Sequence, residues 1–189
     1  AGNVQIELHV AGSVKSAAST IAGIVDRKDP EWGEHKQLAA WDHPVVRQLN
    51  LESQLSDHHI PIVYTDTKKT APADRIKLRT AITDAYIGIT SADFVVAHTA
   101  TMVMKTRPGQ LRSVSLVPSI HICVVHRDQI VSDLAELYTR LQWEPVHKEE
   151  GLTNSLTFIS APSKTGDIEL VMVNGAHGPR EVHLIVIDS

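Results

Sequence analysis

Strand-like segments alternate with segments of helical periodicity along this chain, and this alternation limits its possible folds more than any other feature. Residues 60–65 are rich in β-branched and aromatic side chains and are bounded by polar turns, which predicts a strand. Residues 73–85 carry apolar side chains at helical spacing and lead directly into an apolar segment at residues 86–90. Such alternation predicts an α/β fold in which helices cover a mainly parallel sheet.

Other segments extend this pattern. We expect further strands at residues 4–10, 36–41, 94–97, 101–104, 120–125, 155–159 and 181–188, and further helices at residues 17–25, 43–49, 51–59 and 130–141. The segments 94–97 and 101–104 are separated by a short polar turn and should form a β-hairpin. Residues 143–152 are polar and are expected to be a connector. Thr165 is a candidate cap for one more helix, whose first turn would carry Asp167 and Glu169.

Length and composition favour one soluble domain spanning residues 1–189. The chain has 189 residues with 42% hydrophobic and 21% charged side chains, and none of its apolar runs reaches the roughly 20 residues of a membrane span. Residues 1–12 lack the order of a signal peptide. The single cysteine, Cys123, lies in an apolar segment, so it cannot form an intrachain disulfide and should be a buried thiol. These features predict a cytoplasmic protein.

The charge pattern argues against a nucleic-acid partner. The net charge is -4 and aromatic residues make up 4% of the chain, which leaves neither a basic surface nor side chains on which bases could stack. Lys105, Arg107 and Arg112 form a basic cluster near a turn. They could steer an anionic substrate or simply belong to a solvated loop.

Four segments in order resemble the LUD domain family, and within it the lactate-utilisation protein C group. They are residues 87–104, 113–121, 161–169 and 175–179. The family pattern usually has glycine at the positions of Ala100 and Ala161, proline at Ser119 and arginine at Lys164. Because a Cβ atom restricts positive φ, Ala100 and Ala161 should limit close backbone contact with a ligand. Lys164 keeps the positive charge but loses the bidentate geometry of arginine.

The resemblance implies a NagB/RpiA/CoA-transferase-like α/β fold and a role in the oxidation of L-lactate to pyruvate. It implies one subunit of an oxidoreductase complex, beside iron–sulfur lactate-utilisation subunits, rather than a complete enzyme. A chain with one cysteine cannot by itself hold a cluster bound by four cysteines, so we expect no cofactor here and iron–sulfur clusters in the partners. The alternative is a free-standing enzyme of the same fold that acts on a phosphorylated or acyl substrate.

Two turns rich in backbone N–H groups, at residues 162–166 and 175–178, predict a site for a small carboxylate or phosphate. Lys164 could hold the anion, although the same residues could simply begin a helix. His177 lies between Gly175 and Gly178, and it could donate to a substrate, act as a general base or hold its own turn. His177 and Glu169 are the best catalytic candidates, but no catalytic residue is assigned.

Further candidates come from the other segments of the resemblance. Thr99 and Thr101 could offer hydroxyl groups or be ordinary strand residues, and His121 could contact a ligand or bond a backbone carbonyl. The ligand-binding candidates are Thr99, Thr101, Ser115, His121, Ser163, Lys164, Thr165, Asp167, Gly175, His177 and Gly178. A metal site is not expected, because the histidines lack helical metal-binding spacing, and His183 should be a satisfied sheet residue. We expect the turns around Thr99, Lys164 and His177 to converge on one anion-binding hollow.

Overall fold

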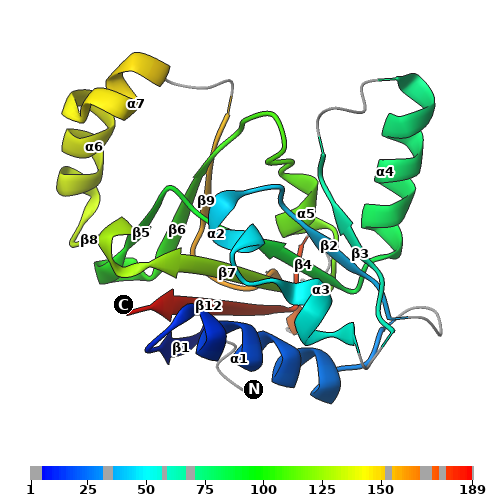
Figure 1. Ribbon diagram of the computed structural model, residues 1–189. Helices are drawn as coiled ribbons and strands as arrows, with labels where there is room; N and C mark the ends of the chain where they lie inside the picture. Colours follow the sequence, from blue (N-terminus) through cyan, green and yellow to red (C-terminus); the bar gives the residue numbers. More distant parts are fainter. Residues whose placement is uncertain are drawn as a thin grey trace.

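The protein is built around a six-stranded parallel sheet with the order β1-β12-β7-β4-β2-β3 (Figure 1). The computed structural model describes residues 6–31, 36–56, 59–66, 71–151, 155–166, 172–174 and 178–188. The strands of this sheet are β1 (Glu7–Ala11), β2 (Leu38–Ala40), β3 (Ile62–Tyr64), β4 (Ile87–Thr90), β7 (Ile120–His126) and β12 (Glu181–Ile187). The predicted α/β fold with a mainly parallel sheet is therefore confirmed.

A second sheet has four strands in the order β8-β5-β6-β9. They are β5 (Phe94–Val96), β6 (Thr101–Lys105), β8 (Ile130–Val131) and β9 (Leu156–Ile159). Strands β5 and β6 form the predicted antiparallel hairpin. Side chains alternate between its two faces, as expected for strands: Val95, Met102 and Met104 join the main core, whereas Phe94, Val96 and Val103 pack in a second apolar cluster with Leu137 and Leu141.

Helices flank both sheets. Those of the described residues are α1 (Val14–Arg27), α2 (Pro44–Arg47), α3 (Leu51–Gln54), α4 (Pro72–Asp84), α5 (Ser113–Leu116), α6 (Leu134–Trp143) and α7 (Pro145–Glu150), with short 3-10 turns at η2 (Ala97–Thr99) and η3 (Arg127–Gln129). In Figure 1, α1 runs alongside β1 and β12, α4 lies at one side beyond β3, and α6 and α7 lie at the opposite side. None of these helices combines the length and the apolar character needed to cross a membrane.

The contact between α5 and the parallel sheet depends on the absence of a side chain at Gly88. A Cβ atom added there would lie 1.8 Å from the carbonyl oxygen of Val114. Only glycine allows the backbone of α5 to approach β4 so closely. The surrounding core is apolar and includes Cys123, whose predicted burial is confirmed. Burial raises the pKa of the Cys123 thiol to about 12, which keeps it protonated at neutral pH.

Two of the segment boundaries predicted from the sequence are wrong. The helix expected from Ile130 begins at Leu134, where the side chain of Asp133 accepts a hydrogen bond from the Glu136 amide. Residues 130–131 instead form β8, which pairs with β5. The expected polar connector at residues 143–152 contains α7, which Pro145 begins at its first turn.

Smaller differences occur elsewhere. The helix near residue 43 is capped by the His43 ring, which accepts from the Val45 amide. The helix predicted from residue 51 ends at Gln54. Thr165 does not cap a helix, because β10 (Lys164–Gly166) pairs with β11 (Met172–Asn174) as an antiparallel ribbon. Backbone pairing across this ribbon replaces the local capping that the sequence suggested.

Candidate functional site

Hydroxyl groups from two distant segments meet beside the β5–β6 hairpin. The side-chain oxygens of Thr99 and Thr101 lie 2.7 Å apart, and Thr101 forms a second hydrogen bond of 2.8 Å with Ser160 at the end of β9. The intervening Ala100 has a φ of 50°, in the left-handed region. Ala100 therefore adopts positive φ despite its Cβ atom. The pairing of β6 with β9 brings Ser160 to the hairpin.

The turn that follows β9 meets the turn that precedes β12. The Ser163 amide donates a 2.7 Å hydrogen bond to the carbonyl of Pro179. A Cβ atom added at Gly178 would lie 3.4 Å from the Ser163 Cβ, so these two turns are in close contact. Two of the predicted ligand-binding residues, Ser163 and Gly178, are thus neighbours although they are distant in sequence.

A third segment joins the same region through the beginning of β7. The Arg180 amide donates to the carbonyl of Ser119 at 2.9 Å, and the Arg180 guanidinium pairs with Glu31 at 2.8 Å. Ser119 also donates from its hydroxyl to Glu31. Hydrogen bonds and short chain connections therefore link parts of all four segments on which the resemblance was based.

Two further candidates, His121 and Ser115, are buried and each has a hydrogen bond. His121 is fully buried, and its Nε2 atom lies 2.8 Å from the Thr90 hydroxyl rather than from a backbone carbonyl. Burial, with a smaller effect from His183, lowers the pKa of His121 to about 3, so its ring is neutral at physiological pH. The hydroxyl of Ser115 is also buried and donates to the carbonyl of Arg112. The other ring nitrogen of His121, Nδ1, is buried and has no hydrogen-bond partner among the described residues.

Lys164 and Thr165 lie in β10, directly after Ser163. Four of the predicted residues, namely Asp167, Glu169, Gly175 and His177, lie outside the described residues. The described part of the site carries the hydroxyl groups of Thr99, Thr101 and Ser160. Such donors can hold the oxygen atoms of a small anion without reacting with it. Ser160 was not predicted, although it directly precedes the segment at residues 161–169.

The basic cluster predicted at residues 105–112 is largely an ion-paired structural element. Lys105 is 1% exposed, and its ammonium group lies 3.0 Å from Glu150. Arg107 also binds Glu150 and lies 2.6 Å from Asp93. Hydrogen bonding from Arg107, followed by that from Lys105, lowers the pKa of Glu150 to about 2. For Lys105 the solvated-loop interpretation is wrong, and neither cation is free to steer a substrate.

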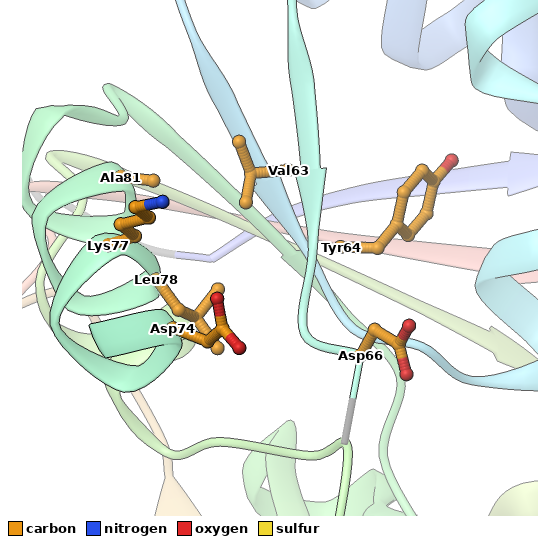
Figure 2. Close-up of a pocket in the computed structure, with 7 residues that line it drawn as sticks. All are labelled: Val63, Tyr64, Asp66, Asp74, Lys77, Leu78 and Ala81. Atoms are coloured by element: carbon orange, nitrogen blue, oxygen red, sulfur yellow. The ribbon is translucent and has the colours of Figure 1, made fainter. Parts of the chain in front are cut away.

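A cavity of about 230 Å³ lies between β3 and α4 (Figure 2). Its lining residues are Val63, Tyr64, Asp66, Asp74, Lys77, Leu78 and Ala81. It is smaller than most sites for small organic ligands, which occupy roughly 300 to 1,000 Å³. The sequence predicted none of the residues that line it, and it is separate from the turns described above.

The chain is similar to proteins of a known family. The model of the LUD domain family matches residues 1–187 of the chain. The chain belongs to the LUD domain family. A relative named lactate utilization protein C from Halalkalibacterium halodurans is 29% identical to this LUD domain over 154 residues, which is 82% of the chain and 64% of the relative. A protein of the same name from Deinococcus radiodurans is 39% identical over 100 residues, which is 52% of the chain and 45% of the relative.

The LUD domain also has a structural neighbour in the crystal structure of a DUF162 family protein from Deinococcus radiodurans. The two share 19% sequence identity with a TM-score of 0.59, covering 96% of this chain and 88% of that one. This similarity supports the α/β fold alone. The LUD domain described here spans less than two thirds of the length of the Halalkalibacterium relative.

Proposed function

We propose that this LUD domain takes part in lactate utilisation, as the non-iron–sulfur subunit of a complex that oxidises L-lactate to pyruvate. In this proposal its linked turns bind a small carboxylate, such as the substrate or product, or a phosphate. The iron–sulfur clusters would reside in partner subunits, because this chain has a single cysteine and Cys123 is buried. The names of the relatives support the role in lactate utilisation.

The observation that carries the proposed binding site is the meeting of the turns at Thr101, Ser160 and Ser163. The hydroxyl groups of Thr101 and Ser160 are hydrogen-bonded to each other at 2.8 Å, and the Ser163 amide, which donates to the Pro179 carbonyl at 2.7 Å, holds the following turn in place. Lys164 follows at once in the sequence and would supply the positive charge that a carboxylate requires. This charge and these donors together form the proposed anion-binding site.

The subunit role is tested by isolating the tagged full-length protein from its source cell. We expect cysteine-rich partners to copurify, and the purified assembly to oxidise L-lactate to pyruvate with an artificial electron acceptor. The control is the same purification from cells that carry the tag alone. Turnover of a sugar phosphate or an acyl-CoA by the isolated chain, without such partners, would contradict this role and support the free-standing enzyme.

The binding site is tested separately by calorimetric titration with L-lactate, pyruvate and inorganic phosphate. Replacing Lys164 with glutamine should weaken binding about 10-fold or more, because a hydrogen bond to a charged group contributes about 1.5 to 3 kcal/mol. The matched control is Lys15→Gln on the exposed surface of α1, which should leave affinity unchanged. Equal affinities for the wild-type protein and the Lys164 variant would exclude Lys164 from the site.

A further inference from the structure

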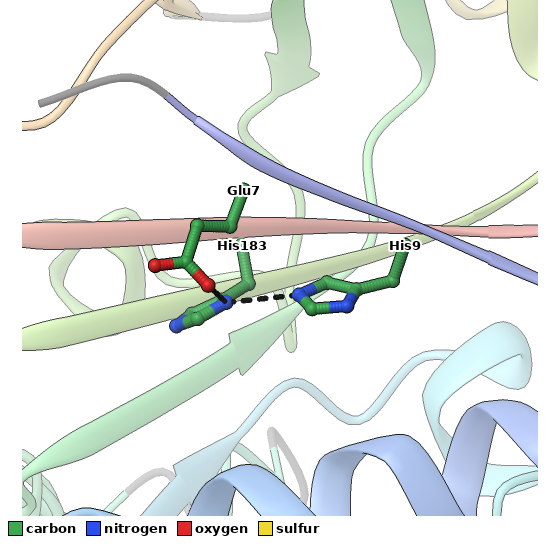
Figure 3. Close-up of side chains that lie close together, drawn as sticks. All are labelled: Glu7, His9 and His183. Carbon is green, nitrogen blue, oxygen red and sulfur yellow. Dashed lines mark hydrogen bonds and ion pairs between the residues drawn. The ribbon is translucent and has the colours of Figure 1, made fainter. Parts of the chain in front are cut away.

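Three side chains with metal-binding atoms gather at the edge of the parallel sheet. Glu7 and His9 lie two residues apart in β1 and so face the same side of the strand. Strand β12 pairs with β1 in parallel and places His183 directly opposite Glu7. Figure 3 shows the carboxylate of Glu7 and the ring of His9 pointing toward the same ring nitrogen of His183.

The distances within this group suit a transition-metal ion. The Nδ1 atom of His183 lies 3.1 Å from the Nε2 atom of His9 and 3.4 Å from a carboxylate oxygen of Glu7. One atom from each residue lies within 4.8 Å of the other two. Two ligand atoms bound to tetrahedral zinc at about 2.0 to 2.1 Å are themselves about 3.4 Å apart. Small side-chain rotations could therefore direct all three atoms to one ion.

The neighbouring residues hold His183 in a form that can bind a metal. Its other ring nitrogen, Nε2, lies 3.0 Å from the carboxylate of Glu181, which in turn pairs with Lys28 at 2.6 Å. A proton on Nε2 that is donated to this carboxylate leaves the lone pair of Nδ1 free on the side of Glu7 and His9. His183 is 1% exposed, so surrounding side chains hold its ring in place.

We propose that Glu7, His9 and His183 form a binding site for a divalent transition-metal ion, with Zn²⁺ as the preferred occupant. Two imidazole nitrogens and one carboxylate oxygen match zinc better than magnesium or calcium, which favour oxygen ligands alone. Three protein ligands leave a coordination position for water or a small molecule, and Glu7 and His9 are accessible enough to admit one. Glu181 acts as a positioning residue that fixes the His183 ring.

The site shares no residue with the proposed anion site, although the two are near in sequence. Glu181 follows Pro179 by two residues, and the Pro179 carbonyl accepts the hydrogen bond from Ser163. The metal proposal requires neither lactate nor a partner subunit. The same geometry also suits a simple hydrogen bond between His9 and His183, and a binding experiment separates these two interpretations.

The test is a calorimetric titration of the metal-stripped full chain with ZnCl₂, repeated with Co²⁺ to follow its visible absorption. We expect one Zn²⁺ ion per chain, a higher melting temperature with Zn²⁺ and a Co²⁺ spectrum typical of a nitrogen and oxygen site. His9→Ala and Glu7→Gln should reduce the Zn²⁺ affinity by more than about 100-fold, since loss of an outer-shell partner alone costs about 10- to 100-fold. Glu181→Gln should lower affinity by about 10-fold and keep the stoichiometry.

The control variant is His98→Ala, which removes an exposed histidine from η2 and should leave Zn²⁺ binding unchanged. His9 and Glu7 are chosen because neither is fully buried, so their variants should fold, and circular dichroism verifies this. Absence of stoichiometric Zn²⁺ binding to the wild-type chain would overturn the proposal. So would unchanged binding in folded His9→Ala and Glu7→Gln proteins, since the ion would then be bound by other histidines.

Discussion

Compared with the parallel sheet, the four-stranded sheet depends much more on charged side chains. Every residue of β4 and all but the last of β7 are buried, mostly among apolar neighbours. At the end of β6, by contrast, the buried ammonium of Lys105 lies against Glu150. Arg107 extends this ion-paired cluster from Glu150 to Asp93, which precedes β5. The parallel sheet is thus stabilised by close packing, and the end of the second sheet by paired charges.

This difference predicts which kind of substitution should destabilise each sheet most. Close-packed interiors tolerate little added volume, because neighbouring atoms cannot move without breaking other contacts. A buried charge tolerates the loss of its partner poorly, because its desolvation is then no longer compensated. The parallel sheet should therefore be most sensitive to added atoms, and the second sheet to removed charges. The following predictions test this division, beginning with the largest expected effect.

Gly88→Ala should be the most damaging substitution in the parallel sheet. The new Cβ atom would lie 1.8 Å from the Val114 carbonyl oxygen, so the backbone of β4 or α5 must shift. We expect the free energy of unfolding to fall by about 3 kcal/mol or more. Urea denaturation measures the change. The control is Gly23→Ala within α1, where alanine should stabilise the helix by up to about 1 kcal/mol. A neutral Gly88→Ala substitution would contradict the close-packing account.

In the second sheet, Glu150→Gln tests the sensitivity to a removed charge. It removes the carboxylate from the Lys105 ammonium, which is 1% exposed, and leaves that charge only partly compensated. We expect a loss of about 2 kcal/mol, below the roughly 3 to 5 kcal/mol of a fully buried pair because Glu150 is partly solvated. Glu149→Gln, one residue earlier on the same helix, is the control and should change stability by less than about 0.5 kcal/mol.

The contribution of the Glu150 ion pairs to stability should decrease at acid pH. The pKa of Glu150 is lowered to about 2, mainly by its hydrogen bond from Arg107. A carboxyl group with a lowered folded-state pKa stabilises the fold above its unfolded pKa, near 4.3, and loses this contribution as the pH falls toward 2. The difference in stability between the wild-type protein and Glu150→Gln should therefore shrink below about pH 4. A difference that is unchanged between pH 7 and pH 3 would argue against the ion pair.

His121 sharpens the comparison, because it is a polar residue within the closely packed sheet. Burial lowers its pKa from 6.5 to about 3, so the unfolded chain takes up a proton at a higher pH than the folded protein does. Its contribution to stability is complete above about pH 6.5 and should fall by about 1.4 kcal/mol per pH unit between there and pH 3. His121→Gln, which can still bond Thr90, should reduce this pH dependence in urea denaturation.

The matched control for this measurement is His98→Gln, because His98 is exposed in η2. The stability of this control variant should depend on pH in the same way as that of the wild-type protein. The contrary result is that the stability of His121→Gln changes between pH 6.5 and pH 5 as strongly as that of the wild-type protein. Burial of a neutral His121 would then not explain the loss of stability in acid.

The sequence predicted part of the candidate site because its turns carry local signals. Pro162 and Gly178 mark turns, and the segments around Thr101 and Ser163 resembled a known family in the correct order. Ser160 was missed, because only the pairing of β6 with β9 brings its hydroxyl to Thr101. The histidine pair was missed for the same reason: His9 and His183 are 174 positions apart, and the pairing of β1 with β12 joins them.

The amino-acid sequence by itself determined the α/β class, the hairpin and most of the strands, because strand and helix periodicities arise between near neighbours in the chain. The tertiary structure decided which strands lie side by side and which charges are buried. It also placed residues 130–131 and 164–166 in strands. These outcomes depend on contacts between distant segments, whose burial and strand register outweigh weak local preferences.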